Sequence, residues 1–195
     1  MVKLGLIRHG TTDWNRRKIV QGRTDIPLDQ LGKKEVAGWC LPPDVRIFKW
    51  IASPLIRATE TAFIMKGEDT ETDYRLSEMS WGDWEGCVLD DLRDKFGDMM
   101  VALERKGLDF KSPNGESPRE VQRRLLPLLE EISSGGEDTL AICHKGIIRA
   151  IYAMADNWDM IGKPQYKLKN GCLHLFELKN NGHPRIVQLN IDMTA

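Results

Sequence analysis

The first apolar run of the chain ends abruptly in basic side chains, since residues 2–12 read Val-Lys-Leu-Gly-Leu-Ile-Arg-His-Gly-Thr-Thr. Its apolar part, Val2 to Ile7, is typical of a short buried strand. Trp50 to Ala52 and Thr139 to Cys143 are two further runs of this kind. Helical patterns separate the three runs. Strands that alternate with helices predict an α/β fold with a mostly parallel sheet.

Capping residues and glycines mark where the helices begin and end. Asp29 is placed to cap one helix, and Ser53, with Pro54 at the first helical position, to cap the next. Ser117 and Glu120 form the pattern of a capping box before a longer amphipathic helix. Together these signals predict helices over residues 30–40, 54–66, 118–134 and 147–154, followed by paired strands over 173–178 and 185–190.

The length of 195 residues suits one domain that spans residues 1–195. Residues 68–111 are rich in charge and glycine, and they contain short helical patterns over 89–96 and 99–106. We interpret this stretch as an excursion from the core that covers the functional site. A second domain with its own core is not expected here.

The charges balance, with 28 Lys and Arg against 29 Asp and Glu and a formal net charge of −1. This balance argues against a nucleic-acid-binding protein and against a polybasic membrane-binding one. No apolar run approaches the ~20 residues that a membrane-spanning helix needs, so we expect no membrane association. The four cysteines lie far apart in the sequence, at Cys40, Cys87, Cys143 and Cys172. We therefore expect reduced thiols and a cytoplasmic protein.

Basic side chains follow the carboxyl ends of the first three predicted strands. Arg8 and His9 follow the first strand directly. Arg57 comes one helical turn after the second strand, and His144 follows the third. Ligands of such sheets bind beyond the carboxyl ends of the strands. Cations that face one another without a partner are costly, so these side chains predict a site for an anion. The planar guanidinium of arginine suits phosphate oxygens, which favours a phosphoryl group.

The same residues belong to an ordered series of motifs that resembles the histidine phosphatase superfamily, whose fold is also called phosphoglycerate mutase-like. The series reaches from Leu4 to about Ala150 and follows the order found in that family. The resemblance implies a three-layer sandwich, in which helices flank a mostly parallel central sheet. The matching motifs are Leu6-Ile7-Arg8-His9-Gly10-Thr11-Thr12-Asp13-Trp14-Asn15, Gln21-Gly22-Arg23-Thr24-Asp25-Ile26-Pro27-Leu28, Ser53-Pro54-Leu55-Ile56-Arg57-Ala58 with Thr61-Ala62, Leu76-Ser77-Glu78 with Trp84-Glu85-Gly86, Asn114-Gly115-Glu116-Ser117 and His144-Lys145-Gly146-Ile147-Ile148-Arg149.

The resemblance also assigns roles in phosphoryl transfer. His9 would be the nucleophile and would form a phosphohistidine that water then cleaves. A neutral imidazole attacks with one ring nitrogen while the other carries the proton, and we expect a backbone carbonyl to hold that proton. Arg8, Arg57 and His144 would bind the phosphoryl oxygens, each worth about 2–4 kcal/mol in the transition state. Asn15 would add a further hydrogen bond.

Glu78 is the candidate general acid, which would protonate the leaving oxygen and then activate water. A carboxyl group placed among anionic oxygens has a raised pKa, so Glu78 could hold a proton near neutral pH. Glu85 is the less favoured carboxylate for this role. Arg23 fits either a contact with the phosphate or the rest of the substrate, or a solvated loop position. Ser53 fits either a hydrogen bond within the pocket or a plain helix cap.

Three further features have two interpretations each. Trp81 and Trp84 either line the pocket or belong to a core, and the core is favoured. The arginines between Arg119 and Arg124 are expected on the solvated face of their helix. Lys145 stands where the family usually has a small residue, and it either adds to the anion site or points to solvent.

Phosphatases and mutases of this family share the histidine chemistry and differ in what accepts the phosphoryl group. Resemblance to the cofactor-dependent mutases would require a tyrosine where Trp81 stands. It would also require a lysine just beyond Gly86, where the chain reads Cys87-Val88. We therefore expect hydrolysis of a small phosphorylated metabolite, with mutase-type transfer as an alternative.

Other classes of function remain as alternatives. The chain could bind a phosphorylated ligand without turnover, although every position of the motif is intact. A metal hydrolase is disfavoured because no cluster of carboxylate ligands accompanies His9 and His144, so neither a metal nor a cofactor is expected. The physiological substrate and the oligomeric state are left open.

Overall fold

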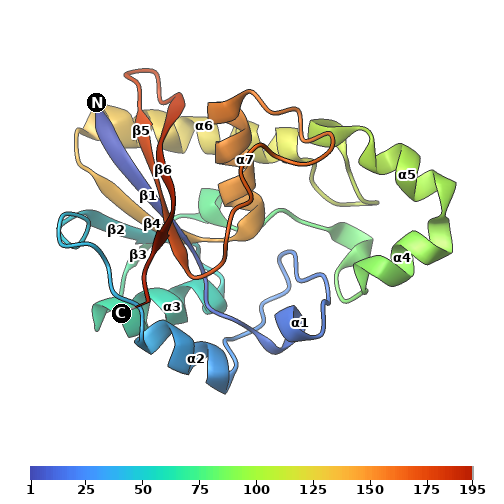
Figure 1. The fold of residues 1–195 in the computed structure, drawn as a ribbon, viewed down its shortest axis with the longest axis horizontal. Helices are drawn as coiled ribbons and strands as arrows, with labels where there is room; N and C mark the ends of the chain where they lie inside the picture. Colours follow the sequence, from blue (N-terminus) through green and yellow to red (C-terminus); the bar gives the residue numbers. More distant parts are fainter. Residues whose placement is uncertain (195) are drawn as a thin grey trace.

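A mixed six-stranded sheet forms the centre of the computed structural model, which describes residues 1–194 (Figure 1). The strand order is β3-β2-β4-β1-β5-β6. The first four strands of this order are mutually parallel, whereas β5 pairs antiparallel with both β1 and β6. The strands are β1 (Val2–Arg8), β2 (Lys49–Ala52), β3 (Glu71–Thr72), β4 (Thr139–Cys143), β5 (Cys172–Leu178) and β6 (Pro184–Asp192).

Seven α-helices connect or follow these strands among residues 1–194. The capping box predicted at Ser117 and Glu120 is present, with Pro118 in the first turn. None of the helices in this part of the chain is both long and apolar enough to cross a membrane. The helices are α1 (Asp13–Arg16), α2 (Gln30–Ala37), α3 (Ile56–Lys66), α4 (Leu89–Phe96), α5 (Asp98–Glu104), α6 (Pro118–Gly135) and α7 (Lys145–Asp156).

The two faces of the sheet are buried in two separate cores. On one face, Leu6 and Ala141 pack with residues of α6 and α7. On the other face, Ile7 and Ile142 pack with residues of α2 and α3. Successive residues of a strand point to opposite faces, so a parallel sheet covered on both sides needs continuous apolar strands. The predicted three-layer α/β sandwich is therefore confirmed (Figure 1).

Several helix boundaries differ from the prediction, among them both ends of α5 and of α7, and two of the differences concern how a helix is capped. The second strand is followed by α3 only from Ile56, and Ser53 does not cap it. The Asp25 carboxylate accepts the Ile56 N–H at 2.8 Å instead, so a distant loop supplies the cap. The other helix, α2, ends at Ala37, before the predicted residue 40, with Gly38 as its C-cap.

The excursion also begins later than predicted. Residues 71–72 form β3, which pairs with β2 at the edge of the sheet and thus belongs to the core fold. Beyond it, α4 and α5 stand apart from the sheet (Figure 1). They enclose a small apolar cluster of their own around Trp84, Leu92 and Met100. Trp81 packs both against this cluster and against the core on the α6 and α7 face of the sheet, so it joins the excursion to the rest of the fold.

Gly32 in α2 and Gly38 at its C-cap provide a matched test of how closely α2 packs against the loop after β1. A Cβ on Gly32 would lie 2.0 Å from the backbone oxygen of Thr11, whereas a Cβ on Gly38 meets nothing closer than 3.5 Å. We expect Gly32→Ala to lower the free energy of unfolding by about 1–3 kcal/mol, although alanine is the better helix former. Gly38→Ala should stay within about 0.5 kcal/mol of the parent. Urea denaturation measures both, and equal stabilities would contradict this packing.

Candidate active site

The parallel strands bring three polar side chains together where they end. The ladder between β1 and β4 continues past both strands, because the His9 N–H donates to the Cys143 oxygen at 3.0 Å. The Ser53 N–H donates likewise to the Ile142 oxygen at 2.9 Å. His9, Ser53 and the residue after β4, His144, therefore stand side by side at one edge of the sheet, as predicted for its carboxyl end.

His9 is held in one tautomer. Its Nδ1 lies 2.6 Å from the Gly10 carbonyl oxygen, which can only accept, so Nδ1 carries the proton. Burial, followed by the charges of Arg8 and Arg57, lowers the pKa of His9 well below its usual value. The imidazole is therefore neutral near pH 7. Its Nε2 makes no hydrogen bond within residues 1–194, which leaves a lone pair free for attack.

His144 faces His9, with their ring centroids 5.2 Å apart and the rings tilted by 57°. Its Nε2 lies 2.7 Å from the Ser53 hydroxyl oxygen. The interpretation of Ser53 as a pocket residue is thus confirmed, and its interpretation as a helix cap is wrong. Burial, then His9, Arg57 and Arg8, lowers the pKa of His144 well below its usual value, so this imidazole is neutral as well.

Two arginines flank the histidines and differ in their anchoring. Arg57 is completely buried. Its two terminal nitrogens donate to the carbonyl oxygens of Thr24 and Gly22 at 2.9 and 2.7 Å. The other arginine, Arg8, donates from Nη1 to Asn170 Oδ1 at 2.8 Å. Burial lowers the pKa of both guanidinium groups, yet both keep their charge because the ordinary arginine pKa is so high.

Three buried nitrogens of this site have no hydrogen-bond partner within the part of the chain that the structure describes: Arg8 Nε, Arg57 Nε and His144 Nδ1. An unpartnered buried polar group costs about 1–3 kcal/mol. Five such side-chain atoms occur in residues 1–194, so the site holds the majority of them. The two guanidinium N–H groups can donate to the oxygens of a phosphoryl group. The free lone pair of the neutral His9 imidazole can attack its phosphorus.

Glu78 reaches the same site from the loop after β3. Its Oε1 accepts the Met79 N–H at 2.9 Å, and its Oε2 accepts the Gly146 N–H at 3.2 Å. A Cβ at position 146 would lie 2.3 Å from Glu78 Oε1, so any residue larger than glycine would require the Glu78 carboxyl group to move. Burial raises the pKa of Glu78 against the opposing effect of these N–H groups and of the arginines. The predicted direction of this shift is therefore present, with burial as its cause.

A network of charged side chains holds the backbone beneath Glu78. Arg124 donates to the Ser77 oxygen at 2.7 Å and to the Glu78 oxygen at 3.3 Å. Glu116 accepts from Arg124 at 2.8 Å and from Arg23 at 3.2 Å. The prediction that Arg124 lies on a solvated helix face is therefore wrong, because its side chain is 17% exposed and ties α6 to the Glu78 loop.

Arg23 belongs to this network too. Its Nε donates to the Glu78 oxygen at 3.3 Å and its Nη1 to the Tyr74 hydroxyl at 3.0 Å, while the guanidinium lies over the Tyr74 ring. Each nitrogen of the guanidinium thus contacts protein. These bonds brace the loop that carries Glu78, and Arg23 is not simply a solvated loop residue. Its contact with a phosphate or substrate stays a prediction.

Glu85 occupies a different environment from Glu78. Its carboxylate accepts hydrogen bonds from the N–H groups of Arg23, Thr24 and Trp81 at 2.9–3.0 Å, and from the Thr24 hydroxyl at 2.7 Å. Burial alone would raise the pKa of Glu85, but these donors outweigh it and hold the pKa below its usual value. Glu85 is thus an ionised clamp between the 21–24 loop and the start of the excursion.

The remaining predicted residues are placed as follows. Asn15 forms a capping box with Thr12, in which its Oδ1 accepts the Thr12 N–H at 3.1 Å. Its Nδ2 makes no hydrogen bond within residues 1–194, so it remains available as a donor. Trp84 is buried in the cluster of the excursion, and Trp81 packs beside it with ring centroids 6.4 Å apart. Both tryptophans thus serve a core.

Sequence reasoning missed one support of the nucleophile. The Thr61 hydroxyl accepts the Gly10 N–H at 3.0 Å and donates to the Arg57 oxygen at 2.7 Å. It therefore holds the backbone of Gly10, the residue whose carbonyl oxygen accepts the proton of His9. A signal was present, since Thr61-Ala62 is part of a matching motif, but a threonine inside a helix has no distinctive spacing of its own.

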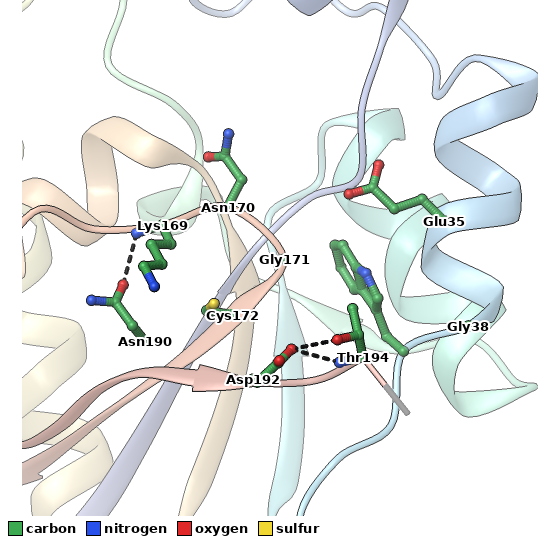
Figure 2. A pocket seen from close by; sticks show the side chains of 10 residues that line it. Glu35, Gly38, Lys169, Asn170, Gly171, Cys172, Asn190, Asp192 and Thr194 are labelled. Atoms are coloured by element: carbon green, nitrogen blue, oxygen red, sulfur yellow. Dashed lines mark hydrogen bonds between the residues drawn. The ribbon is translucent and has the colours of Figure 1, made fainter.

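A groove beside Arg8 was not predicted at all. It lies between α2 and the start of β5, and Figure 2 shows its lining residues. Asn170, the acceptor of Arg8, lines it together with Glu35, which accepts from the Thr11 hydroxyl at 2.9 Å. No group of three His, Cys, Asp or Glu side chains within residues 1–194 is arranged to hold a metal ion.

This arrangement of two histidines, two arginines and a carboxyl group agrees with the comparison to known families. A model of the histidine phosphatase superfamily (branch 1) matches residues 4–192. The chain belongs to this superfamily. The family predicted from the motifs is therefore confirmed.

Two curated relatives of the chain carry the name of a mutase. The 2,3-bisphosphoglycerate-dependent phosphoglycerate mutase of Allorhizobium ampelinum is 33% identical, over 98% of this chain and 92% of the relative. The mutase of the same name from Azorhizobium caulinodans is 32% identical, over 90% of this chain and 91% of the relative.

Solved structures with a similar fold are named phosphatases. Mycobacterial glucosyl-3-phosphoglycerate phosphatase superposes with a TM-score of 0.79 at 22% identity, over 98% of this chain and all 100% of the other. The α-ribazole phosphatase from Shigella flexneri has a TM-score of 0.77 at 22% identity, over 97% and 96% of the two chains. At this identity the likeness demonstrates the shared fold.

Proposed function

We propose that the chain hydrolyses phosphomonoesters through a phosphohistidine at His9. The observation that carries this proposal is the neutral imidazole whose Nδ1 proton is fixed on the Gly10 oxygen, leaving Nε2 free. The buried, unpartnered nitrogens of Arg8, Arg57 and His144 support it, because they provide donors for phosphoryl oxygens at the same place.

The first half of the reaction transfers the phosphoryl group to the enzyme. His9 Nε2 attacks phosphorus in line with the leaving oxygen, and the bond between phosphorus and that oxygen breaks. Arg8, Arg57 and His144 stabilise the charge on the other three oxygens, with Asn15 as a further donor. The carboxylic acid of Glu78 gives its proton to the leaving oxygen. The product alcohol then departs.

The second half returns the enzyme to its starting state. The Glu78 carboxylate takes a proton from a water molecule as its oxygen attacks phosphorus. The bond between phosphorus and Nε2 breaks, and inorganic phosphate and neutral His9 result. The raised pKa of Glu78 suits both steps, since the group must be an acid in the first and a base in the second.

Mutase-type transfer is the second candidate, because the relatives quoted above carry a mutase name. We favour hydrolysis since Trp81 and Cys87-Val88 stand where resemblance to the mutases would require a tyrosine and a lysine. A small phosphorylated metabolite is the proposed substrate, and no metal takes part in the proposed steps.

Replacement of His9 should abolish the covalent intermediate. The protein is allowed to react with a labelled phosphomonoester, and the reaction is stopped without acid. The parent protein should then carry an acid-labile, base-stable phosphohistidine, and His9→Ala should carry none. His183→Ala is the matched control, since His183 lies in the β5–β6 turn at the opposite end of the sheet. It should label like the parent. Hydrolysis that persists undiminished in His9→Ala would refute the assignment of the nucleophile.

Replacement of Glu78 should matter most for poor leaving groups. Glu78→Gln should lower kcat/KM, which reports the steps up to departure of the alcohol, about 10²- to 10⁴-fold for an alkyl phosphate, which needs a proton on its leaving oxygen. The loss should be far smaller for p-nitrophenyl phosphate, although kcat falls for both esters because both share the attack of water. Glu85→Gln is the control carboxylate and should change the two esters by the same factor. Steady-state kinetics on both esters measure this difference. If Glu78→Gln lowered kcat/KM by the same factor for both esters, Glu78 would not be the general acid.

The fate of the phosphoryl group separates the two candidate functions. With 3-phosphoglycerate and a trace of 2,3-bisphosphoglycerate, we expect release of inorganic phosphate without accumulation of 2-phosphoglycerate, and the rate should be unchanged in EDTA. Isomer formation faster than phosphate release would identify a mutase. Loss of activity in EDTA would point instead to a metal hydrolase.

A further inference from the structure

Three cations beside the active site have no carboxylate partner. Lys145 and Arg149 lie on α7, and Lys167 lies on the loop before β5. None of the three forms an ion pair with any residue between 1 and 194. By contrast, Arg75 pairs with Asp73 and Glu131 at 2.6 Å.

The position of Lys145 is electrostatically unfavourable in three ways. It is the first residue of α7, where the helix dipole presents partial positive charge and repels a cation. Arg149 follows it at i+4, the spacing at which like charges destabilise a helix by about 0.2–0.5 kcal/mol. Its third unfavourable neighbour is Arg8. Burial, followed by Arg8 and Arg149, lowers the pKa of Lys145.

Lys145 is also directly connected to the reaction site. The residue before it, His144, faces His9, and the N–H of the residue after it, Gly146, donates to Glu78. The Lys145 side chain nevertheless reaches the surface. An exposed lysine therefore stands in the chain directly between two residues of the phosphoryl site.

The other two cations lie close enough to Lys145 to lower its pKa. The Arg149 guanidinium lies over the Trp158 ring, 5.0 Å from its centroid, which orients it without neutralising it. Lys167 is exposed and close enough to Lys145 to lower its pKa further. Glu78 is the nearby carboxylate with the opposite effect, but both of its oxygens are engaged by backbone N–H groups.

We propose that Lys145, with Arg149 and Lys167, binds a second anionic group of the substrate, on the α7 side of the phosphoryl site. The proposal rests on the proposed phosphatase function and narrows its substrate class to phosphomonoesters that carry a further carboxylate or phosphate. Such a ligand supplies the counter-charge that the chain itself does not provide. Lys145 is then a specificity-determining residue, and the bound anion offsets the electrostatic cost of a lysine at the start of α7.

Matched pairs of substrates test this proposal. 3-Phosphoglycerate is compared with glycerol 3-phosphate to test a carboxylate as the second anionic group. Fructose 1,6-bisphosphate is compared with fructose 6-phosphate to test a phosphate as the second anionic group. Wild type should favour the more anionic member of at least one pair about tenfold in kcat/KM. The pair that shows the preference identifies which anion is bound. The preference should decrease as ionic strength rises, because exposed charges are screened.

Two substitutions of Lys145 should change this ratio. Lys145→Ala should cut the preference about fivefold, and Lys145→Glu should reverse it. Lys179→Ala is the matched control, because Lys179 is an exposed lysine in the turn after β5, at the other end of the sheet. Its ratio should equal that of wild type. A ratio measured on one protein cancels general losses of activity or folding.

The outcomes separate this proposal from the proposed function. If wild type hydrolyses both members of each pair equally, or if Lys145→Glu keeps the preference, the second anion site is refuted while the phosphatase function stands. If no phosphomonoester is hydrolysed by wild type in a manner that depends on His9, the proposed function itself fails.

Discussion

The burial of positive charge at the ends of the parallel strands is the constraint on which the rest of the site depends. Arg57 is fully buried, and its guanidinium holds the Gly22–Thr24 backbone by two hydrogen bonds. Burial is the largest cause of the lowered pKa of His9, and the charges of Arg8 and Arg57 lower it further. One feature therefore fixes the loop, helps to keep the nucleophile neutral and creates the attraction for an anion. Thr61 joins the backbone of Arg57 to that of Gly10, the residue whose carbonyl oxygen fixes the tautomer of His9.

The two carboxylates of the site show how environment sets a role. Glu78 is buried with few donors and has a raised pKa, whereas Glu85 collects backbone N–H groups and has a lowered one. When the pKa values of two carboxyl groups are pushed apart in this way, the group with the raised pKa can act as an acid and the other stays ionised. The network of Arg124, Glu116 and Arg23 holds the backbone beneath Glu78. The position of the Glu78 carboxyl group thus depends on arginines that bond to the backbone of its loop and not to the carboxyl group itself.

Much of the fold and of the site could be predicted from the sequence, because it depends on residues that are close together in the chain. The three core strands, the capping box at Ser117 and the convergence of His9 with His144 follow from apolar runs and from the geometry of parallel strands. What could not be predicted depends on distant partners. Ser53 was expected as a cap in one interpretation, but Asp25 supplies that hydrogen bond from another loop. Arg124 has the spacing of a surface arginine and becomes buried only because the Glu78 loop packs onto its helix.

The central claim is that the phosphoryl group is transferred twice, first to His9 and then to water. Its most direct test is the stereochemistry at phosphorus, with a phosphorothioate ester made chiral by oxygen isotopes and hydrolysed in isotopically labelled water. Each in-line transfer inverts the configuration. Two transfers predict net retention in the released thiophosphate. Net inversion would show that water attacks the substrate directly and would contradict the account.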